Sequence, residues 1–288
     1  MQISILIPAY NEEKTIGKVV MDFKKQLPES KIYVCDNNSG DKTAEIAEKT
    51  GAHILRENRL GKGYALQKLL TIKSDIYVVV DGDDTYPAEK VKNLIQPITE
   101  NKADMAIASR KRFNSGIVRN FGNFFVTTLL NLFFNRNPTP PVIDWGIARS
   151  LRLLGRISEN TNIPATSIAD SHHQLKTDGI FVFKHKLHDA LSGYRAFNYN
   201  LIKNLNLKSK GFEIETELTI KAIESNFRII EIPVNYTARK ESKLRAYKDG
   251  IRIILALITL FIYYHPIKFF SIIAITSVIA GLVFGVQI

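Results

Sequence analysis

Hydrophobic and polar positions alternate with two different periods through the first hundred residues. Short apolar runs bounded by turn residues predict strands, and amphipathic stretches between them predict helices. The predicted strands are Ile3–Ile7, Ile32–Asp36, Ala52–Leu55, Ile76–Val80 and Asp104–Ala108, and the predicted helices are Glu13–Lys25, Thr43–Lys49, Gly63–Ile72 and Glu89–Thr99. Such alternation indicates a parallel sheet with helices on both faces, so the predicted fold class is α/β.

The pattern is less regular in the second half of the chain. Ile117–Phe134 is dense in Phe, Leu and Val, which predicts an apolar helix lying either on a membrane surface or against the sheet. Residues 137–186 have weak periodicity, and we assign no element there. From Leu187 the pattern returns, with a helix predicted over Gly211–Ser225 and a strand over Phe227–Ile232.

The C-terminal segment is the most apolar part of the chain. Phe269–Ile288 has no charged residue and approaches the roughly 20 apolar residues that cross a bilayer. Ile251–Tyr264 is also largely apolar but contains Arg252, which suits a helix at the membrane interface, with a soluble core helix as the alternative. The expected domains are a globular domain over 1–240, a basic juxtamembrane segment with an interfacial helix over 241–266, and one transmembrane helix over 267–288.

The charge distribution favours a membrane over nucleic acid. The formal net charge is +11, and basic residues gather just before the apolar tail, at Arg239, Lys240, Lys243, Arg245, Lys248 and Arg252. Basic residues beside a span attract anionic headgroups and tend to stay cytoplasmic, and no nucleic-acid motif accompanies them. Met1–Ile7 predicts a strand and not a signal peptide, so we expect a membrane protein with its globular domain in the cytosol. The single cysteine, Cys35, excludes an intrachain disulfide.

The most informative candidate for chemistry is Asp81-Gly82-Asp83-Asp84, which directly follows the predicted strand Ile76–Val80. Ligands of open α/β sheets bind beyond the carboxyl ends of the strands. A hard divalent cation is typically held by one or two carboxylates together with phosphate oxygens and water. The motif therefore predicts a cation and diphosphate site, although Asp and Gly also favour a plain acidic turn.

Three other polar motifs follow predicted strands or precede predicted helices. Pro8–Glu13 and Asp36–Thr43 each leave a strand, and both could also be ordinary helix caps or turns. Gly61-Lys62-Gly63 offers backbone donors and a cation, but its spacing differs from that of a triphosphatase phosphate loop. Each of these signals is weak when taken alone.

Taken together, the motifs resemble those of the family 2 glycosyltransferases. The resemblance rests on Ile7–Glu13, Asp36–Thr43, Gly61–Gly63 and Asp81–Pro87. It is closer to the branch of dolichol-phosphate mannosyltransferases and bacterial polyprenyl-phosphate glycosyltransferases, as suggested by Ala108–Arg110, Arg119–Asn123, Asp189–Arg195, Gly211–Glu215 and Ser242–Leu244. This resemblance implies a Rossmann-like fold of the A-type glycosyltransferases with C-terminal membrane helices.

The resemblance also implies roles for individual residues. The nucleoside of a nucleoside diphosphate sugar would contact Pro8, Tyr10, Glu12 and Asp36, and Lys62 would add a cation beside the phosphates. A Mg²⁺ or Mn²⁺ ion and the diphosphate would be held by Asp81 and Asp83. Phosphate contacts would come from Arg110, Arg119, Arg195 and Lys243, since guanidinium groups bind phosphate bidentately and lysine supplies a point charge; each could instead be a solvated surface cation. Asp83, Asp189 and Arg195 are the expected catalytic residues.

The implied reaction is an inverting, metal-dependent transfer of a hexose to a polyprenyl phosphate, dolichyl or undecaprenyl, at the cytosolic membrane face. A phosphate monoester has a second pKa of about 6 and arrives already nucleophilic, so Asp189 would orient the donor sugar or the metal shell. If the acceptor were instead a hydroxyl of a glycan or lipid, Asp189 would be the general base.

The chain departs from the family's pattern at residues 137–186, which are longer than the usual connection and contain Trp145 and His172-His173. This insert leaves open a specificity element, an oligomer contact, or a catalytically silent nucleotide-sugar binder. Neither the oligomeric state nor the identity of the nucleotide and sugar follows from the sequence.

Overall fold

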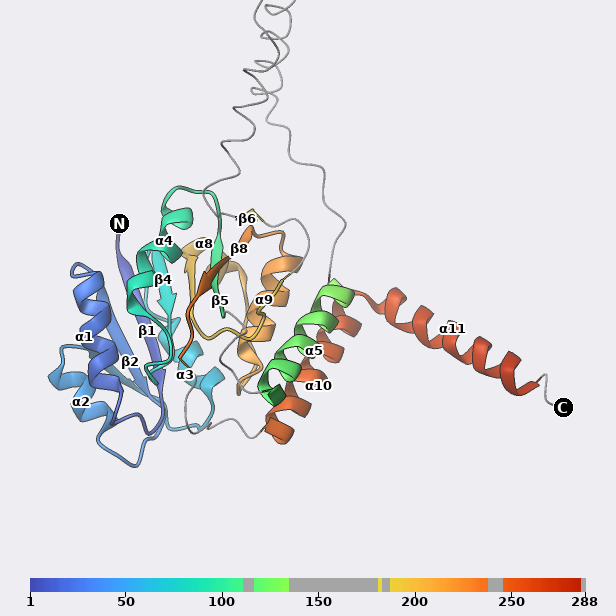
Figure 1. The fold of residues 1–288 in the computed structure, drawn as a ribbon, viewed down its shortest axis with the longest axis horizontal. Helices are drawn as coiled ribbons and strands as arrows, with labels where there is room; N and C mark the ends of the chain where they lie inside the picture. Colours follow the sequence, from blue (N-terminus) through green and yellow to red (C-terminus); the bar gives the residue numbers. More distant parts are fainter. Residues whose placement is uncertain (111–116, 135–180, 183–186, 238–245, 286–288) are drawn as a thin grey trace, which may run out of the picture.

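The computed structural model describes residues 1–110, 117–134, 181–182, 187–237 and 246–285, which are coloured in Figure 1. Their core is an eight-stranded sheet with the order β3-β2-β1-β4-β7-β5-β8-β6. The strands are β1 (Ile3–Ala9), β2 (Lys31–Asp36), β3 (His53–Arg56), β4 (Ile76–Val79), β5 (Met105–Arg110), β6 (Phe181–Val182), β7 (Arg195–Asn198) and β8 (Ile229–Val234). The α/β class is as predicted.

The sheet is mixed, and the prediction of a parallel sheet is wrong for its centre. β1 pairs in parallel with β2 and β4, and β5 pairs in parallel with β8. β7 lies between β4 and β5 and is antiparallel to both, and the short β6 is antiparallel to β8. β7 escaped prediction because it has only four residues and carries polar side chains at both ends, Arg195 and Asn198.

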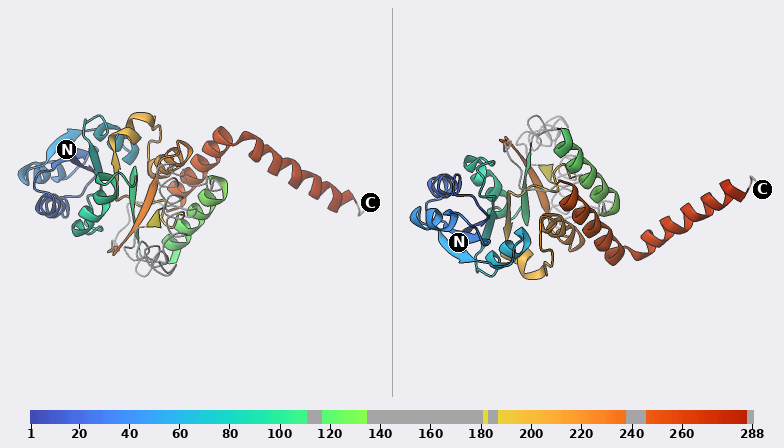
Figure 2. Two further views of the ribbon diagram at one scale, coloured as in Figure 1. Left: turned by 90° about the horizontal axis from the view of Figure 1, so that it is seen from above. Right: turned by 90° about the horizontal axis from the view of Figure 1, so that it is seen from below.

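Alternate residues of a strand point to opposite faces of the sheet. Both faces carry apolar side chains, and helices cover both of them. Ile5 and Ile7 of β1 join a core beneath α1 (Ile16–Gln26), α2 (Thr43–Lys49) and α4 (Val91–Thr99), which follows the short 3₁₀ helix η1 (Ala88–Lys90). Leu6 points to a second core beneath α3 (Lys62–Leu69), α5 (Ile117–Phe134), α8 (Tyr199–Asn204), α9 (Ile214–Glu224) and α10 (Ala246–Tyr264). Figure 2 shows the sheet between these two layers.

The helix predictions agree best where apolar periodicity is strong. Thr43–Lys49 and Ile117–Phe134 begin and end as predicted. α1 begins at Ile16 instead of Glu13, because Asn11 has a positive φ of 50° and the backbone N–H of Glu12 is held by Thr43. α8 was not predicted.

The two C-terminal helices differ in how they are covered. α10 packs one face on α5 and α9, with Leu257 buried and the Phe261 ring stacked on Phe133 at a centroid distance of 4.2 Å. α11 (Pro266–Gly285) projects away from the body of the molecule (Figure 1), and most of its described apolar side chains are exposed, whereas Phe269 at its start is partly buried.

One transmembrane helix over 267–288 stays a prediction, because 286–288 lie outside the residues that the structure describes. Within the described residues no single helix has the length and apolar composition to cross a bilayer. The helical stretches Gly250–Tyr264 and Pro266–Leu282 meet that requirement only together, and they are bent by 106° at the break between them.

Candidate functional site

The candidate site lies at one edge of the sheet, where β1, β2, β4 and β5 end. These four strands run in the same direction, so their carboxyl ends meet at that edge. Polar residues follow β1 from Tyr10, β2 from Asn37 and β4 from Asp81, and Asp36 and Arg110 are the last residues of their strands. The topology therefore brings together motifs that are up to a hundred residues apart in sequence.

The loops after β1 and β2 are joined by hydrogen bonds. The backbone N–H of Asn11 donates to Ser39 Oγ at 3.0 Å, and the N–H of Gly40 donates to Asn11 Oδ1 at 2.8 Å. The N–H of Glu12 donates to Thr43 Oγ1 at 2.7 Å. Of the predicted nucleoside residues on β1 and its loop, Pro8 and Glu12 are buried, whereas Tyr10 is 41% exposed.

Asp36 and its neighbour Asn37 arrange the next loop. Asp36 Oδ1 accepts a hydrogen bond from the N–H of Ser39. The buried Asn37 side chain donates to the carbonyls of Glu57 and Arg59 at 3.0 and 2.7 Å and accepts from the N–H of Gly61 at 2.8 Å. Asn37 thus holds the start of the Gly-Lys-Gly segment, a role that the sequence did not reveal because the same motif is also typical of a plain turn.

Lys62 ties the acidic turn to α9. Its ammonium Nζ lies 2.5 Å from Asp81 Oδ1 and also donates to Glu215 Oε1. Burial by itself lowers the pKa of Lys62, but the charges of Asp81 and Glu215 outweigh it and raise that pKa. Burial raises the pKa of Glu215 above its ordinary value, and Asp81 adds to this, although Lys62 opposes it. Glu215 ends the Gly211–Glu215 motif, but no role for it was predicted from the sequence.

The remaining acids of the turn have different partners. Asp83 Oδ1 accepts hydrogen bonds from Thr85 Oγ1 at 2.6 Å and from the Thr85 N–H at 3.3 Å. Asp84 has a positive φ of 58° and pairs with Lys18 Nζ at 2.7 Å on the outer side of α1. The turn therefore presents Asp81 and Asp83 separately from Asp84.

The donor set suits a hard cation whose remaining ligands are phosphate oxygens and water. Among the described residues, no three His, Cys, Asp or Glu side chains converge as a group that could hold a metal ion. Two carboxylates completed by phosphate oxygens and water are nevertheless an ordinary arrangement for Mg²⁺. Asp81 and Asp83 supply such a pair of hard oxygen donors.

A second charged pair lies at the end of β5. Arg110 Nε and Nη2 donate to the two carboxylate oxygens of Asp189 at 2.6 and 2.7 Å, and the Arg110 N–H also donates to Oδ2 at 3.0 Å. Asp189 is only 1% exposed. Burial alone would lower the pKa of Arg110, but Tyr86 and Asp189 raise it well above its ordinary value. This bidentate pair fixes both side chains at the site edge.

Glu231 of β8 supports Asp189 from behind. Its carboxylate accepts the backbone N–H groups of His188 and Asp189, at 3.0 and 2.8 Å, and lies 2.8 Å from His188 Nδ1. Burial raises the pKa of Glu231 above its ordinary value. The sequence placed Glu231 in a strand without a role, because a polar residue in an alternating strand normally faces solvent.

Tyr86 interacts electrostatically with members of both charged pairs. Its hydroxyl accepts a hydrogen bond from the N–H of Gly193 at 3.1 Å, and burial, opposed by Arg110 and reinforced by Asp81 and Asp189, raises its pKa. Gly193 itself packs on Asp81 so closely that a Cβ atom at position 193 would clash with the Asp81 carboxylate. The Asp189–Arg195 loop thereby contacts the acidic turn directly.

Arg195 differs from the expectation of a phosphate contact. The side chain is 1% exposed, and its guanidinium donates to the carbonyls of Ser192 and Ala190 and to Thr219 Oγ1 at 2.6–2.8 Å. These three bonds point inward, so Arg195 holds the loop that carries Asp189 and Gly193. Its positive charge suggested a phosphate ligand, because sequence alone does not show which way a side chain points.

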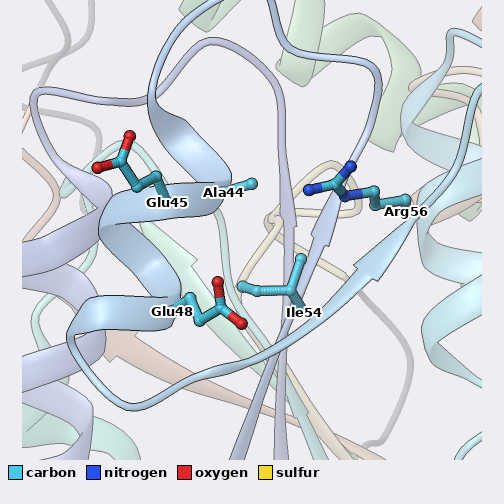
Figure 3. Close-up of a pocket in the computed structure, with 5 residues that line it drawn as sticks. All are labelled: Ala44, Glu45, Glu48, Ile54 and Arg56. Carbon is cyan, nitrogen blue, oxygen red and sulfur yellow. The ribbon is translucent and has the colours of Figure 1, made fainter.

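Several predicted features cannot be placed. Lys243 and nearly all of the insert at 137–186 lie outside the described residues, and Arg119 is located only by the backbone of α5. A pocket that was not predicted lies between α2 and β3, lined by Ala44, Glu45, Glu48, Ile54 and Arg56 (Figure 3). Arg56 is the register partner of Asp36, so this pocket borders the site at its outer end.

Comparison with known proteins places the chain among sugar transferases. Residues 4–204 match the family model described as glycosyl transferase family 2. The chain is 26% identical to glycosyltransferase AglJ of Haloferax volcanii, with 97% of this chain and 78% of that protein covered. It is 24% identical to polyprenol monophosphomannose synthase of Mycolicibacterium smegmatis, with 86% and 82% covered.

A solved structure shows the same fold. Glucosyl-3-phosphoglycerate synthase of Mycobacterium tuberculosis in complex with UDP matches with a TM-score of 0.62 and 19% identity, over 90% of this chain and 80% of that one. The same enzyme has also been solved with Mn²⁺, UDP and phosphoglyceric acid.

Proposed function

This chain belongs to glycosyl transferase family 2, and we propose that it transfers a hexose from a nucleoside diphosphate sugar to a polyprenyl phosphate. The observation that carries the proposal is the meeting of two charged pairs at one sheet edge. Lys62 and Asp81 form one pair and Arg110 and Asp189 form the other, and Tyr86 interacts with members of both. The relative named polyprenol monophosphomannose synthase supports the acceptor class.

On the donor side, the residues present hard oxygen atoms and positive charge where a diphosphate would leave. Asp81 and Asp83 would hold Mg²⁺ or Mn²⁺, which when bound supplies charge neutralisation for the leaving diphosphate. The nucleoside would lie along the loops after β1 and β2, beside Tyr10, Glu12 and Asp36. Lys62 would contact the phosphates, since it is the cation nearest to Asp81 among the described ion pairs.

On the acceptor side, the pairing of Asp189 argues against a general base. Both of its carboxylate oxygens accept hydrogen bonds from Arg110. A lipid phosphate, with a second pKa of about 6, needs no base near neutral pH. Its oxygen would attack the anomeric carbon opposite the leaving nucleotide, so that the new carbon–oxygen bond forms as the bond to the diphosphate breaks and the configuration inverts.

We further propose that the enzyme works at the cytosolic face of a membrane. The exposed apolar side chains of α11, among them Ile267, Phe270 and Ile275, would be poorly solvated in water. The bent pair formed by α10 and α11 suits an embedded or interfacial element. Fractionation of the full-length protein with the membrane, and its release by detergent but not by high salt, would support this location; a soluble protein without detergent would contradict it.

The reaction is tested with the full chain in detergent and labelled hexoses on UDP and GDP. We expect label in the lipid phase with polyprenyl phosphate, no transfer to the matching dephosphorylated prenol, and loss of activity with a chelator. The rate should rise with ionisation of the acceptor phosphate and be flat above its second pKa, about 6.

A variant separates this reaction from transfer to a hydroxyl. Asp189→Asn should lose activity through mispositioning at every pH, with no rescue at high pH. With a hydroxyl acceptor, the rate of the wild type would instead fall at acidic pH as the general base is protonated, and the variant would lack this fall. Efficient transfer to prenol or to a sugar hydroxyl, with none to prenyl phosphate, would overturn the proposal.

A further inference from the structure

Lys62 forms an internal ion pair with a carboxylate that the proposed function assigns to a divalent cation. The ammonium of Lys62, at the start of α3, contacts Asp81 after β4 and Glu215 in the first turn of α9. The three side chains are 11%, 27% and 9% exposed, so this cluster is largely shielded from solvent. Shielding strengthens the attraction between the charges, because water screens them less.

The geometry around Asp81 leaves little room for two cations. Lys62 Nζ lies 2.5 Å from Oδ1, and the backbone of Gly193 packs against the carboxylate so closely that a Cβ atom would clash with it. A divalent cation on Asp81 would therefore stand within a few ångströms of the ammonium, where like charges repel strongly in a shielded site. Binding of the cation requires Lys62 to move away from Asp81.

Glu215 provides a second attachment for Lys62. Because Glu215 is buried on α9 and contacts the same ammonium, Lys62 can leave Asp81 without leaving the site. A diphosphate that enters the site brings negative charge, with which the released ammonium can pair. Binding of the cation would then favour binding of the diphosphate, and binding of the diphosphate would favour binding of the cation.

We propose that Lys62 is a built-in counter-ion that weakens the binding of a divalent cation at Asp81 until a nucleoside diphosphate arrives. Glu215 is the positioning residue that keeps Lys62 in place during the exchange. This inference rests on the proposed function and deepens it, because it makes cation and donor bind cooperatively. A purely structural ion pair would stabilise the fold without affecting the affinity for the cation.

The test measures Mn²⁺ binding to the full chain in detergent, without donor or acceptor, by the loss of the free-ion EPR signal. We expect Lys62→Met to bind Mn²⁺ about tenfold more tightly than the wild type, a coupling of ordinary size between interacting sites. Glu215→Gln should bind Mn²⁺ more weakly, because Asp81 is then the one acidic partner left to Lys62 among the described residues.

Two further variants separate the role of Lys62 from a general change of charge at the site. Lys62→Met leaves an additional buried acid, so the double variant Lys62→Met/Glu215→Gln is included, and it should still bind Mn²⁺ more tightly than the wild type. Lys18→Met is the matched control, because Lys18 pairs at 2.7 Å with Asp84 of the same turn. Its affinity for Mn²⁺ should equal that of the wild type.

Cooperativity provides an independent measurement. UDP and GDP are tested separately, and at least one of them should increase the affinity of the wild type for Mn²⁺. This increase in affinity should be several-fold smaller in Lys62→Met. Equal Mn²⁺ affinity in the wild type, Lys62→Met and the double variant would overturn the inference, as would equal tightening in Lys18→Met. The proposed function fails separately, through absence of hexose transfer to prenyl phosphate by the wild type.

Discussion

The proposed donor side and the proposed acceptor side of the site are built in different ways. On the donor side, the loops after β1 and β2 are joined by hydrogen bonds between residues 28 to 31 positions apart, and their strands are parallel neighbours. On the acceptor side, Arg110 reaches Asp189 across 79 positions, and Gly193 reaches Tyr86 across 107. Adjacent parallel strands bring the donor motifs together almost automatically, whereas the acceptor side depends on tertiary closure around β7.

The largest effect on activity is expected on the proposed donor side. Asp83→Ala should lower kcat/KM by about a hundred- to a thousandfold, the usual cost of removing one group that stabilises transition-state charge. Its thermal midpoint should change little, because Asp83 lies in the turn after β4 and belongs to neither apolar core. Steady-state kinetics in saturating Mg²⁺ or Mn²⁺ measures the effect. Asp84→Ala, which removes the pair with Lys18, should retain most of the activity; similar losses in both variants would contradict the separate roles of the acids.

On the proposed acceptor side, substitution of a buried residue should mainly lower the free energy of unfolding. Arg195→Met removes three hydrogen bonds from a buried guanidinium, and we expect a loss of about 3 kcal/mol in the free energy of unfolding because buried partners remain unpaired. Arg56→Met, at an exposed position on the edge strand β3, should change it by less than about 0.5 kcal/mol. Urea denaturation measures both. A stable Arg195→Met protein that fails only in acceptor binding would restore the predicted phosphate contact.

Acid should weaken the contact between Asp104 and Arg228, the residues that precede β5 and β8. Burial alone would raise the pKa of Asp104, but hydrogen bonds from Arg228 outweigh it and lower the net pKa. The carboxylate therefore stabilises the fold fully above its unfolded pKa of about 3.9, and this contribution is lost as the pH falls through the lower folded value. Asp104→Asn should cost about 1–2 kcal/mol at pH 7.

The same variant should show a flatter pH dependence. Urea midpoints between about pH 5 and pH 2 should fall less steeply in Asp104→Asn than in the wild type, because the folded and unfolded states then differ by one fewer linked proton. Parallel curves for the two proteins would show that Asp104 titrates alike in both states.

The smallest effect is expected at the buried hydroxyl of Tyr194, in the Asp189–Arg195 loop. Tyr194 is fully buried, and its hydroxyl has no hydrogen-bond partner within the described part of the chain. Tyr194→Phe should leave the free energy of unfolding unchanged or raise it slightly, since an unsatisfied polar group is removed. Tyr86→Phe should cost about 1 kcal/mol, because it leaves the N–H of Gly193 without its acceptor. Thermal denaturation of the two variants distinguishes them, and a larger loss at Tyr194 would reveal a partner for its hydroxyl.

The sequence predicted the positions of the motifs at strand ends better than the contacts around Asp189 and Arg195, for a physical reason. Strand ends and the Asp-x-Asp turn are local patterns, so the positions of Asp36 and Asp81 followed from periodicity. The inward direction of Arg195, the support given by Glu231 and the pairing of Asp189 depend on residues distant in sequence. No local signal marks such contacts, and the charge of Arg195 suggested a ligand where the fold has a buried donor.

The position of β7 has a consequence for how the protein is made. β4 and β5 each pair with β7 and not with one another, so the centre of the sheet stays open until Arg195–Asn198 has left the ribosome. Pairing between strands so distant in sequence is slow to form, and unpaired strand edges readily join other chains. Chains interrupted before Arg195 should therefore aggregate during synthesis, which makes the interval between β5 and β7 a period of chaperone dependence.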